Sequence, residues 1–147
     1  MNTFNEHVHS VSKRPQLPAK APYLLVTALF AAAVGLSGVA SLAQLDPIPA
    51  TFARLGLPLS LAVALGACKL AGAIALFVPG RPRLREWAYA GLTFDLAGAV
   101  LLHLAAGDGL AETQAPALLT VLGLVSYALY RRSDAASLPL AAAGAHA

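Results

Sequence analysis

Long apolar runs alternate with short polar segments along the chain, and this alternation predicts the fold. A helix rises about 1.5 Å per residue, so about 20 apolar residues cross the hydrocarbon core of a bilayer, which is about 30 Å thick. The pattern predicts an all-α fold, an integral membrane bundle of four helices. The expected helices cover residues 23–45, 57–78, 87–106 and 115–130, the last being the shortest.

Proline and polar residues bound the expected transmembrane domain, which covers residues 22–132. Pro47 and Pro49 end the first helix, because proline lacks an amide donor and disfavours helix in the residue before it. A loop is expected between these prolines and the second helix. The polar segment 1–21 cannot bury enough apolar surface to order itself and is expected to be a mobile cytoplasmic tail. The segment 133–147 is expected to be a loosely ordered cytoplasmic tail.

The composition also indicates a protein that lies in the lipid bilayer. Hydrophobic residues make up 58% of the chain and charged residues 12%, far from the averages of soluble domains. A soluble helical bundle would need polar helix faces, which these runs lack. The formal net charge of +3 does not indicate a nucleic-acid partner, because the charges lie between the runs rather than on one face. The single cysteine, Cys68, allows neither an intrachain disulfide nor a C-x-x-C dithiol.

Lysine and arginine gather in alternate polar segments, and this predicts the orientation of the chain. The polar segment after the first helix holds only Arg54, and the segment after the third holds no basic residue. Because short cytoplasmic loops carry an excess of lysine and arginine, both termini are expected in the cytoplasm. The basic clusters are Lys13, Arg14 and Lys20 before the first helix, Arg81, Arg83 and Arg85 between the second and third, and Arg131 and Arg132 after the fourth.

Two residues of opposite charge, Lys69 and Asp95, lie inside apolar runs. A charge at the centre of a membrane helix costs about 2.5–3.5 kcal/mol and normally finds a partner. Measured along the helices from the basic loop between them, Lys69 lies about 13 Å and Asp95 about 12 Å deep. An ion pair near the midplane is therefore expected. Gly91 and Gly98 share a face with Asp95, and such small residues let membrane helices approach closely.

His103 follows Asp95 by two helical turns, so it is expected to face the same interior nearer to the outer boundary. An imidazole there can exchange protons or bond the oxygen of a quinone or another polar ligand. Lys69, Asp95 and His103 would then form a polar track from the midplane to the outer surface. A buried ion pair can equally serve only to fix how helices pack, and a single histidine can be structural. The residue pattern leaves both interpretations open.

The start of the third helix carries residues with expected supporting roles. Trp87 and Tyr89 are expected at the headgroup level, where amphipathic rings anchor a helix. Glu86 lies on the opposite face from Asp95 and is expected to pair with an arginine or to complement the helix N-terminus. The sequence contains no nucleotide-binding loop, zinc-protease motif or nucleophile elbow, and no metal site is expected.

Several segments resemble the DoxX-like family of small four-helix bacterial membrane proteins. The similarity covers about residues 21–132 and implies a multi-pass protein of the bacterial inner membrane. Many relatives carry glutamate where Lys69 stands, so the chain looks like a lysine-bearing branch. The segments that carry the resemblance are KLAGAIALFVP (69–79), LREWAYAG (84–91), Phe94-Asp95, Gly98-Ala99, His103 and Gly107-Asp108.

The resemblance implies a function only in outline. The chain is similar to the small membrane subunit of thiosulfate:quinone oxidoreductase, and some members of the family are thought to join oxidative-stress or thiol-homeostasis complexes at the membrane. This implies a quinone-associated redox accessory subunit rather than a stand-alone enzyme, with a quinone as cofactor and a redox protein or a second copy as partner. Two alternatives stay open: a structural or assembly module, and a small proton-coupled transporter. The absence of an unpaired intramembrane carboxylate counts against the transporter.

Overall fold

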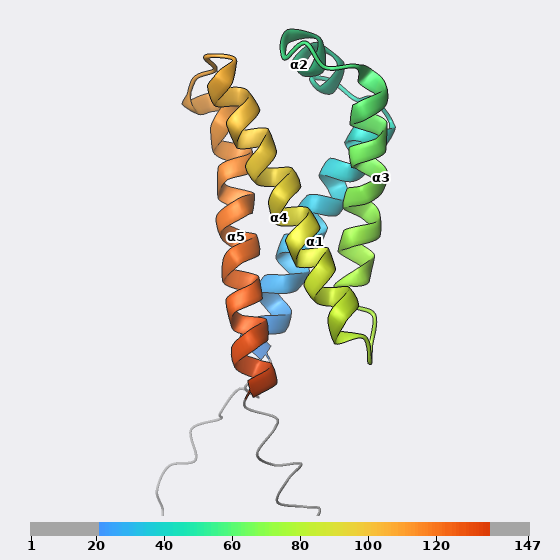
Figure 1. The fold of residues 1–147 in the computed structure, drawn as a ribbon, viewed down its shortest axis with the longest axis vertical. Helices are drawn as coiled ribbons and strands as arrows, with labels where there is room; N and C mark the ends of the chain where they lie inside the picture. The colour runs from blue at the N-terminus through green and yellow to red at the C-terminus, as the bar shows by residue number, and fades with distance from the viewer. Residues whose placement is uncertain (1–20, 136–147) are drawn as a thin grey trace, which may run out of the picture.

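The computed structural model describes residues 21–135, which form five α-helices and no strand (Figure 1). Three of these helices, α1, α4 and α5, are long and apolar enough to cross a membrane, and α3 is a shorter apolar helix. The expected tails 1–21 and 133–147 lie outside the described residues, except for their inner ends, which belong to α1 and α5. The helices are α1 (Ala21–Leu42), α2 (Ile48–Arg54), α3 (Leu59–Ala75), α4 (Pro82–Ala105) and α5 (Leu110–Ala135).

The helices begin and end at other residues than the apolar runs do. α4 begins at Pro82 rather than residue 87, because proline suits the first turn of a helix and the polar residues after it continue the turn. α5 begins at Leu110 rather than residue 115, and the Thr113 hydroxyl donates to the Gly109 carbonyl in its first turn, at 3.0 Å. An apolar run marks the part of a helix that suits lipid, whereas backbone hydrogen bonding continues into its polar ends.

The segment between α1 and α3, expected to be a loop, contains the short helix α2. Pro49 lies in its first turn, where a missing amide donor costs nothing. α1 ends at Leu42, before a turn in which Gln44 has a positive φ, and the two prolines do not prevent the next helix from starting. α2 lies at the same end of the molecule as the turn between α4 and α5 (Figure 1).

The closest helix crossing joins α1 to α3 rather than α3 to α4. α1 packs mainly against α3 and α5, and α4 mainly against α5. At the crossing, a Cβ atom added at Gly66 would lie 2.8 Å from the carbonyl oxygen of Gly38, so the two backbones touch. The close approach expected at Gly91 and Gly98 is wrong, because a Cβ atom at either would meet nothing within 4 Å. α3 and α4 instead diverge from their connecting turn toward the α2 end (Figure 1).

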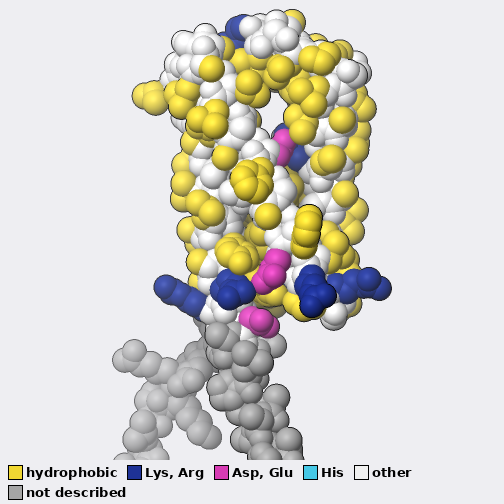
Figure 2. Space-filling model, in the orientation of Figure 1, with side chains coloured by type: hydrophobic (Ala, Val, Ile, Leu, Met, Phe, Trp, Pro, Cys, Tyr) yellow, Lys and Arg dark blue, Asp and Glu magenta, His cyan; other side chains and the backbone are white. Residues whose placement is uncertain are grey.

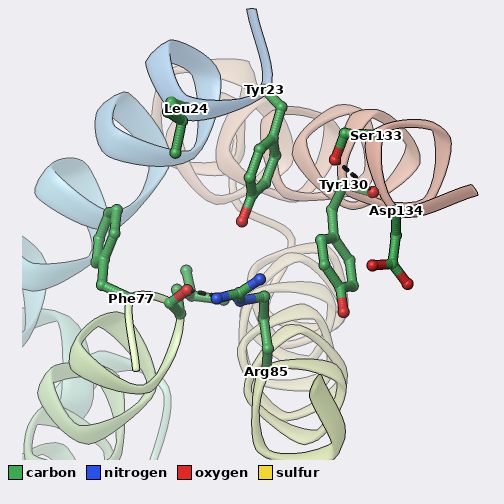
Figure 3. A pocket seen from close by; sticks show the side chains of 8 residues that line it. Tyr23, Leu24, Phe77, Arg85, Tyr130, Ser133 and Asp134 are labelled. Carbon is green, nitrogen blue, oxygen red and sulfur yellow. Dashed lines mark hydrogen bonds between the residues drawn. The ribbon is translucent and has the colours of Figure 1, made fainter. Parts of the chain in front are cut away.

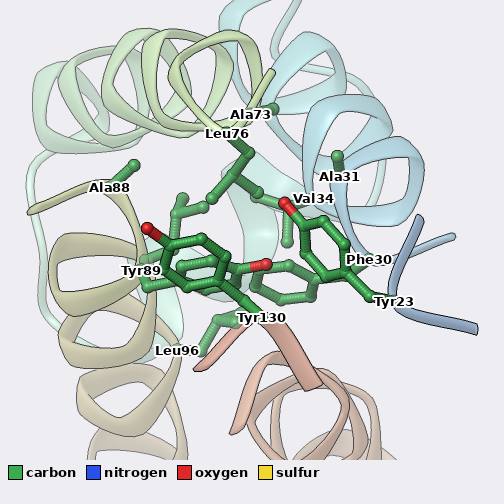
Figure 4. Close-up of a cluster of buried hydrophobic side chains, with 11 residues drawn as sticks. Tyr23, Phe30, Ala31, Val34, Ala73, Leu76, Ala88, Tyr89, Leu96 and Tyr130 are labelled. Atoms are coloured by element: carbon green, nitrogen blue, oxygen red, sulfur yellow. The ribbon is translucent and has the colours of Figure 1, made fainter. Parts of the chain in front are cut away.

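A cluster of aromatic and aliphatic side chains fills the space between α1, α4 and α5 away from α2 (Figure 4). Tyr89 lies inside this cluster and is only 2% exposed, so its ring packs against protein and does not anchor the helix in the headgroups. Its hydroxyl lies 3.1 Å from Thr27 Oγ1 and 2.7 Å from Ser126 Oγ, which are themselves 2.8 Å apart. This hydroxyl triangle links three helices, and each such interhelical bond contributes about 0.6 kcal/mol in a membrane protein. Trp87, in contrast, is 77% exposed on the outer surface.

Basic side chains gather at the end of the molecule opposite α2 (Figure 2). Glu86 pairs with an arginine as expected, and the partner is Arg131 of α5, at 3.0 Å. Arg85 binds the end of α3: its Nε donates to the Leu76 carbonyl at 2.8 Å, while its guanidinium lies over the Tyr130 ring. A cavity of about 270 Å³ lies beside this guanidinium, between α1, α4 and α5 (Figure 3). These contacts close the basic end of the bundle.

Candidate functional site

Lys69 and Asp95 form the ion pair that the sequence predicts between α3 and α4. Lys69 Nζ lies 3.4 Å from Asp95 Oδ2, and the two side chains are 14% and 15% exposed. The contact is electrostatic rather than a well-directed hydrogen bond, because Asp95 Oδ2 is buried without a hydrogen-bond partner among residues 21–135. The carboxylate therefore keeps a free capacity to accept a hydrogen bond, which in a buried site is costly to leave unused.

His103 does not contact this pair and has its own acidic partner. Its Nδ1 lies 2.6 Å from Oδ2 of Asp108, whose side chain is only 5% exposed. The other oxygen of that carboxylate accepts a hydrogen bond from the Arg54 guanidinium at the end of α2. A chain of three polar side chains thus joins α2, the end of α4 and the turn after α4.

Sequence reasoning missed Asp108 and Arg54 as partners of His103. Asp108 stands in a Gly-Asp-Gly turn, and Arg54 is the one basic residue of a segment that was expected to be a loop. The sequence did contain one signal for this contact: Asp108 and Arg54 have opposite charges and are expected on the same side of the membrane. The pairing itself depends on α2, which brings the guanidinium over the turn.

One cavity brings together all three polar residues that the sequence selects. It has a volume of about 400 Å³ and is lined by Lys69, Asp95 and His103, with Ser37 and Ser41 contributed by α1. Figure 2 shows this face of the molecule hollowed toward the α2 end, with an acidic and a basic side chain at the inner end of the hollow. Most of the remaining lining is apolar, including Phe52, Leu57, Leu61, Leu65, Phe94 and Leu102.

The glycines near Asp95 line open space rather than a helix contact. Gly98 lines the cavity just described, which explains why its Cβ position is empty. Gly91 and Trp87 line a second hollow of about 540 Å³ between α3 and α4. Lys69 and Asp95 line this second hollow as well, so the ion pair lies between the two spaces. Glu86 and Tyr89 lie away from both.

The cavity has the character of a small-molecule site. Ligand pockets are usually 300–1,000 Å³, mostly apolar, with a few polar groups that orient the ligand. Here Lys69 supplies donors, Asp95 supplies acceptors, and the His103 ring supplies either, depending on its proton. Within residues 21–135 no group of three His, Cys, Asp or Glu side chains is placed to hold a metal ion.

Comparison with known proteins identifies the chain at the level of its family. No curated protein matched the sequence, and no solved structure matched it either. The profile of the DoxX-like family matches residues 25–126, which include α2 and α3, α4 and both hollows. Apolar helices of the length that crosses a bilayer agree with that match. The chain therefore belongs to the DoxX-like family of membrane proteins.

Proposed function

We propose that the protein binds the head of a quinone in the cavity between its helices and serves as an accessory subunit to a membrane redox enzyme. The observation that supports this proposal is the convergence of Lys69, Asp95 and His103 on a cavity that is otherwise apolar. A quinone head is a flat apolar ring with two oxygens on opposite edges, so it needs apolar walls and polar groups at separate points.

Each part of the cavity has a role in this binding mode. The Lys69 ammonium donates to one ligand oxygen, and the His103 imidazole bonds the other. The ring packs against apolar side chains such as Phe52 of α2 and Phe94 of α4. The second hollow between α3 and α4 shares Lys69 and Asp95 with the cavity and gives the isoprenoid tail a path to the lipid.

Replacing His103 with alanine is expected to weaken binding of the reduced ligand about tenfold, since one hydrogen bond to its hydroxyl group is lost. The affinity for decylubiquinol can be followed in detergent through the fluorescence of Trp87, which lines the second hollow and is the one tryptophan of the chain. Arg132→Gln, at the opposite end of the molecule, serves as the matched control. An unchanged affinity in His103→Ala, with a normal folded yield, contradicts this binding mode.

We further propose that the chain crosses the bacterial inner membrane four times with both termini in the cytoplasm. α1 ends at the α2 end of the molecule, and α4 begins at the opposite end (Figure 1). Since α3 is the helix that connects these two ends, α3 crosses wherever α1 and α4 do. The basic residues at the end opposite α2 support a cytoplasmic location for that end (Figure 2).

Labelling of single cysteines tests this orientation. In a Cys68→Ser background, Ala111→Cys at the start of α5 is expected to react with a membrane-impermeant maleimide added to spheroplasts. Arg83→Cys in the basic turn is expected to react only after lysis, because it faces the cytoplasm. Both positions are exposed in the structure, so access to the thiol reports the side of the membrane. The reverse labelling pattern contradicts the orientation.

A structural or assembly module is the second candidate, and the Lys69–Asp95 contact is the observation that favours it. The ion pair joins two helices that otherwise diverge, so it can hold the bundle together without any ligand. A redox protein or a second copy of the chain would then bind the assembled bundle. The stability and ligand affinity of variants of the ion pair distinguish the two candidates.

A further inference from the structure

We infer that Asp108 is a positioning residue that fixes the proton of the His103 ring, and that the cavity consequently prefers the reduced quinol to the oxidised quinone. The inference rests on the proposed quinone site.

Asp108 determines which nitrogen of the His103 ring carries the proton. The Asp108 carboxylate is nearly fully buried and accepts a hydrogen bond from Arg54 through its Oδ1. A carboxylate paired with a guanidinium has only acceptor sites to offer. Its contact of 2.6 Å with His103 is therefore a hydrogen bond donated by Nδ1. Asp108 thus holds His103 in the tautomer with the proton on Nδ1.

The other ring nitrogen of His103, Nε2, remains for a ligand. With Nδ1 occupied by Asp108, a ligand in the cavity can reach the ring only through Nε2. In the neutral ring held by Asp108, Nε2 has a lone pair and no proton, so it accepts a hydrogen bond. The cavity therefore presents an acceptor at His103.

The other polar groups of the cavity do not discriminate in this way. Asp95 Oδ2 is fully buried beside Lys69 Nζ, at 3.4 Å, so a ligand in the cavity does not reach it. Lys69 donates to either redox form, because a carbonyl and a hydroxyl oxygen both accept. Lys69 therefore does not discriminate between them.

The acceptor at His103 decides between the two redox forms of the ligand. A quinol carries two hydroxyl groups that donate, whereas a quinone carries two carbonyl groups that only accept. The quinol donates to His103 Nε2, while the quinone leaves this nitrogen unpaired. Sites built to hydrogen-bond a hydroxyl reject analogues that lack it, because their own polar groups are then left unsatisfied. We expect decylubiquinol to bind about tenfold more tightly than decylubiquinone.

Asp108→Asn is the variant that tests the inference. An asparagine amide can donate to Nδ1 and move the ring proton to Nε2, so His103 would then favour a carbonyl. The ratio of quinol to quinone affinity is expected to fall about tenfold in this variant. Arg132→Gln, at the opposite end of the molecule (Figure 1), serves as the control and is expected to preserve the ratio. A merely structural role for Asp108 predicts that both affinities fall together with an unchanged ratio.

A spectroscopic measurement keeps the test decisive if Asp108→Asn fails to fold. Nitrogen chemical shifts of the full-length protein labelled at histidine report which ring nitrogen carries the proton, and His103→Gln assigns the signal. A proton on Nδ1 is expected, and a proton on Nε2 overturns the inference. Failure of the wild-type protein to bind either redox form instead removes the proposed function. Equal binding of both forms, with no effect of Asp108→Asn on their ratio, removes only the inference.

Discussion

Replacing Lys69 with methionine is expected to lower the free energy of unfolding by about 3 kcal/mol, because the Asp95 carboxylate then stays buried without its counter-charge. The two side chains are 14% and 15% exposed and lie 3.4 Å apart, so the carboxylate loses a close counter-charge at a largely buried position. Methionine keeps the length and the apolar stem of lysine, which limits the change to the charge. Unfolding in detergent by SDS titration, followed by circular dichroism, measures the loss.

The double variant Lys69→Met/Asp95→Leu separates the structural role of the pair from a role in binding. Exchanging a whole buried ion pair for apolar residues is often neutral, so most of the lost stability should return. A double variant that is stable but no longer binds decylubiquinone supports the proposed site. A double variant that is stable and binds normally supports the assembly module. Full stability of both single variants would show that the charges do not depend on each other.

Replacing Gly66 with alanine is expected to lower the free energy of unfolding by about 2 kcal/mol through overpacking at the α1–α3 crossing. The added Cβ would lie 2.8 Å from the Gly38 carbonyl oxygen and 2.9 Å from Ser41 Cβ. A backbone oxygen cannot rotate away as a flexible side chain can, so the two helices must move apart. The same SDS titration measures the change.

Gly91→Ala provides the matched control for this crossing. Like Gly66 it lies inside an apolar helix, but a Cβ atom there meets nothing within 4 Å. Alanine has the higher helix propensity, so this variant is expected to be neutral or slightly more stable. If Gly66→Ala is as stable as Gly91→Ala, the helices are not held at the close distance described here.

The parts of the structure that follow from local spacing could be predicted from the sequence. The depth of Lys69 and Asp95 depends only on the helical rise and on the turn between their helices, and the ion pair is present as expected. The four longest helices lie at the apolar runs, because the length and composition of each run are local properties of the sequence. Membership of the DoxX-like family could likewise be inferred from short segments on α3 and α4.

The parts that depend on contacts between distant segments could not be predicted. Tyr89 near a helix end can satisfy its hydroxyl in water or against buried partners, and only the fold shows that Thr27 and Ser126 lie beside it. Glycines such as Gly98 favour close packing only where a neighbouring helix arrives, and here a cavity lies there instead. Asp108 pairs with His103 because the fold places the turn after α4 beside the imidazole ring, and the sequence alone does not show this contact.

The contact between Arg85 and the end of α3 has a consequence for how so short a helix would fit a bilayer in the proposed four-crossing arrangement. α3 has 17 residues, a length of about 26 Å against a hydrocarbon core of about 30 Å. Its last carbonyls have no further helical turn to donate hydrogen bonds to them. Arg85 donates to Leu76 O at 2.8 Å and to Val78 O at 3.4 Å. The guanidinium supplies the donors that one more turn of helix would supply, so in that arrangement the protein itself compensates for the mismatch and the lipid need not deform.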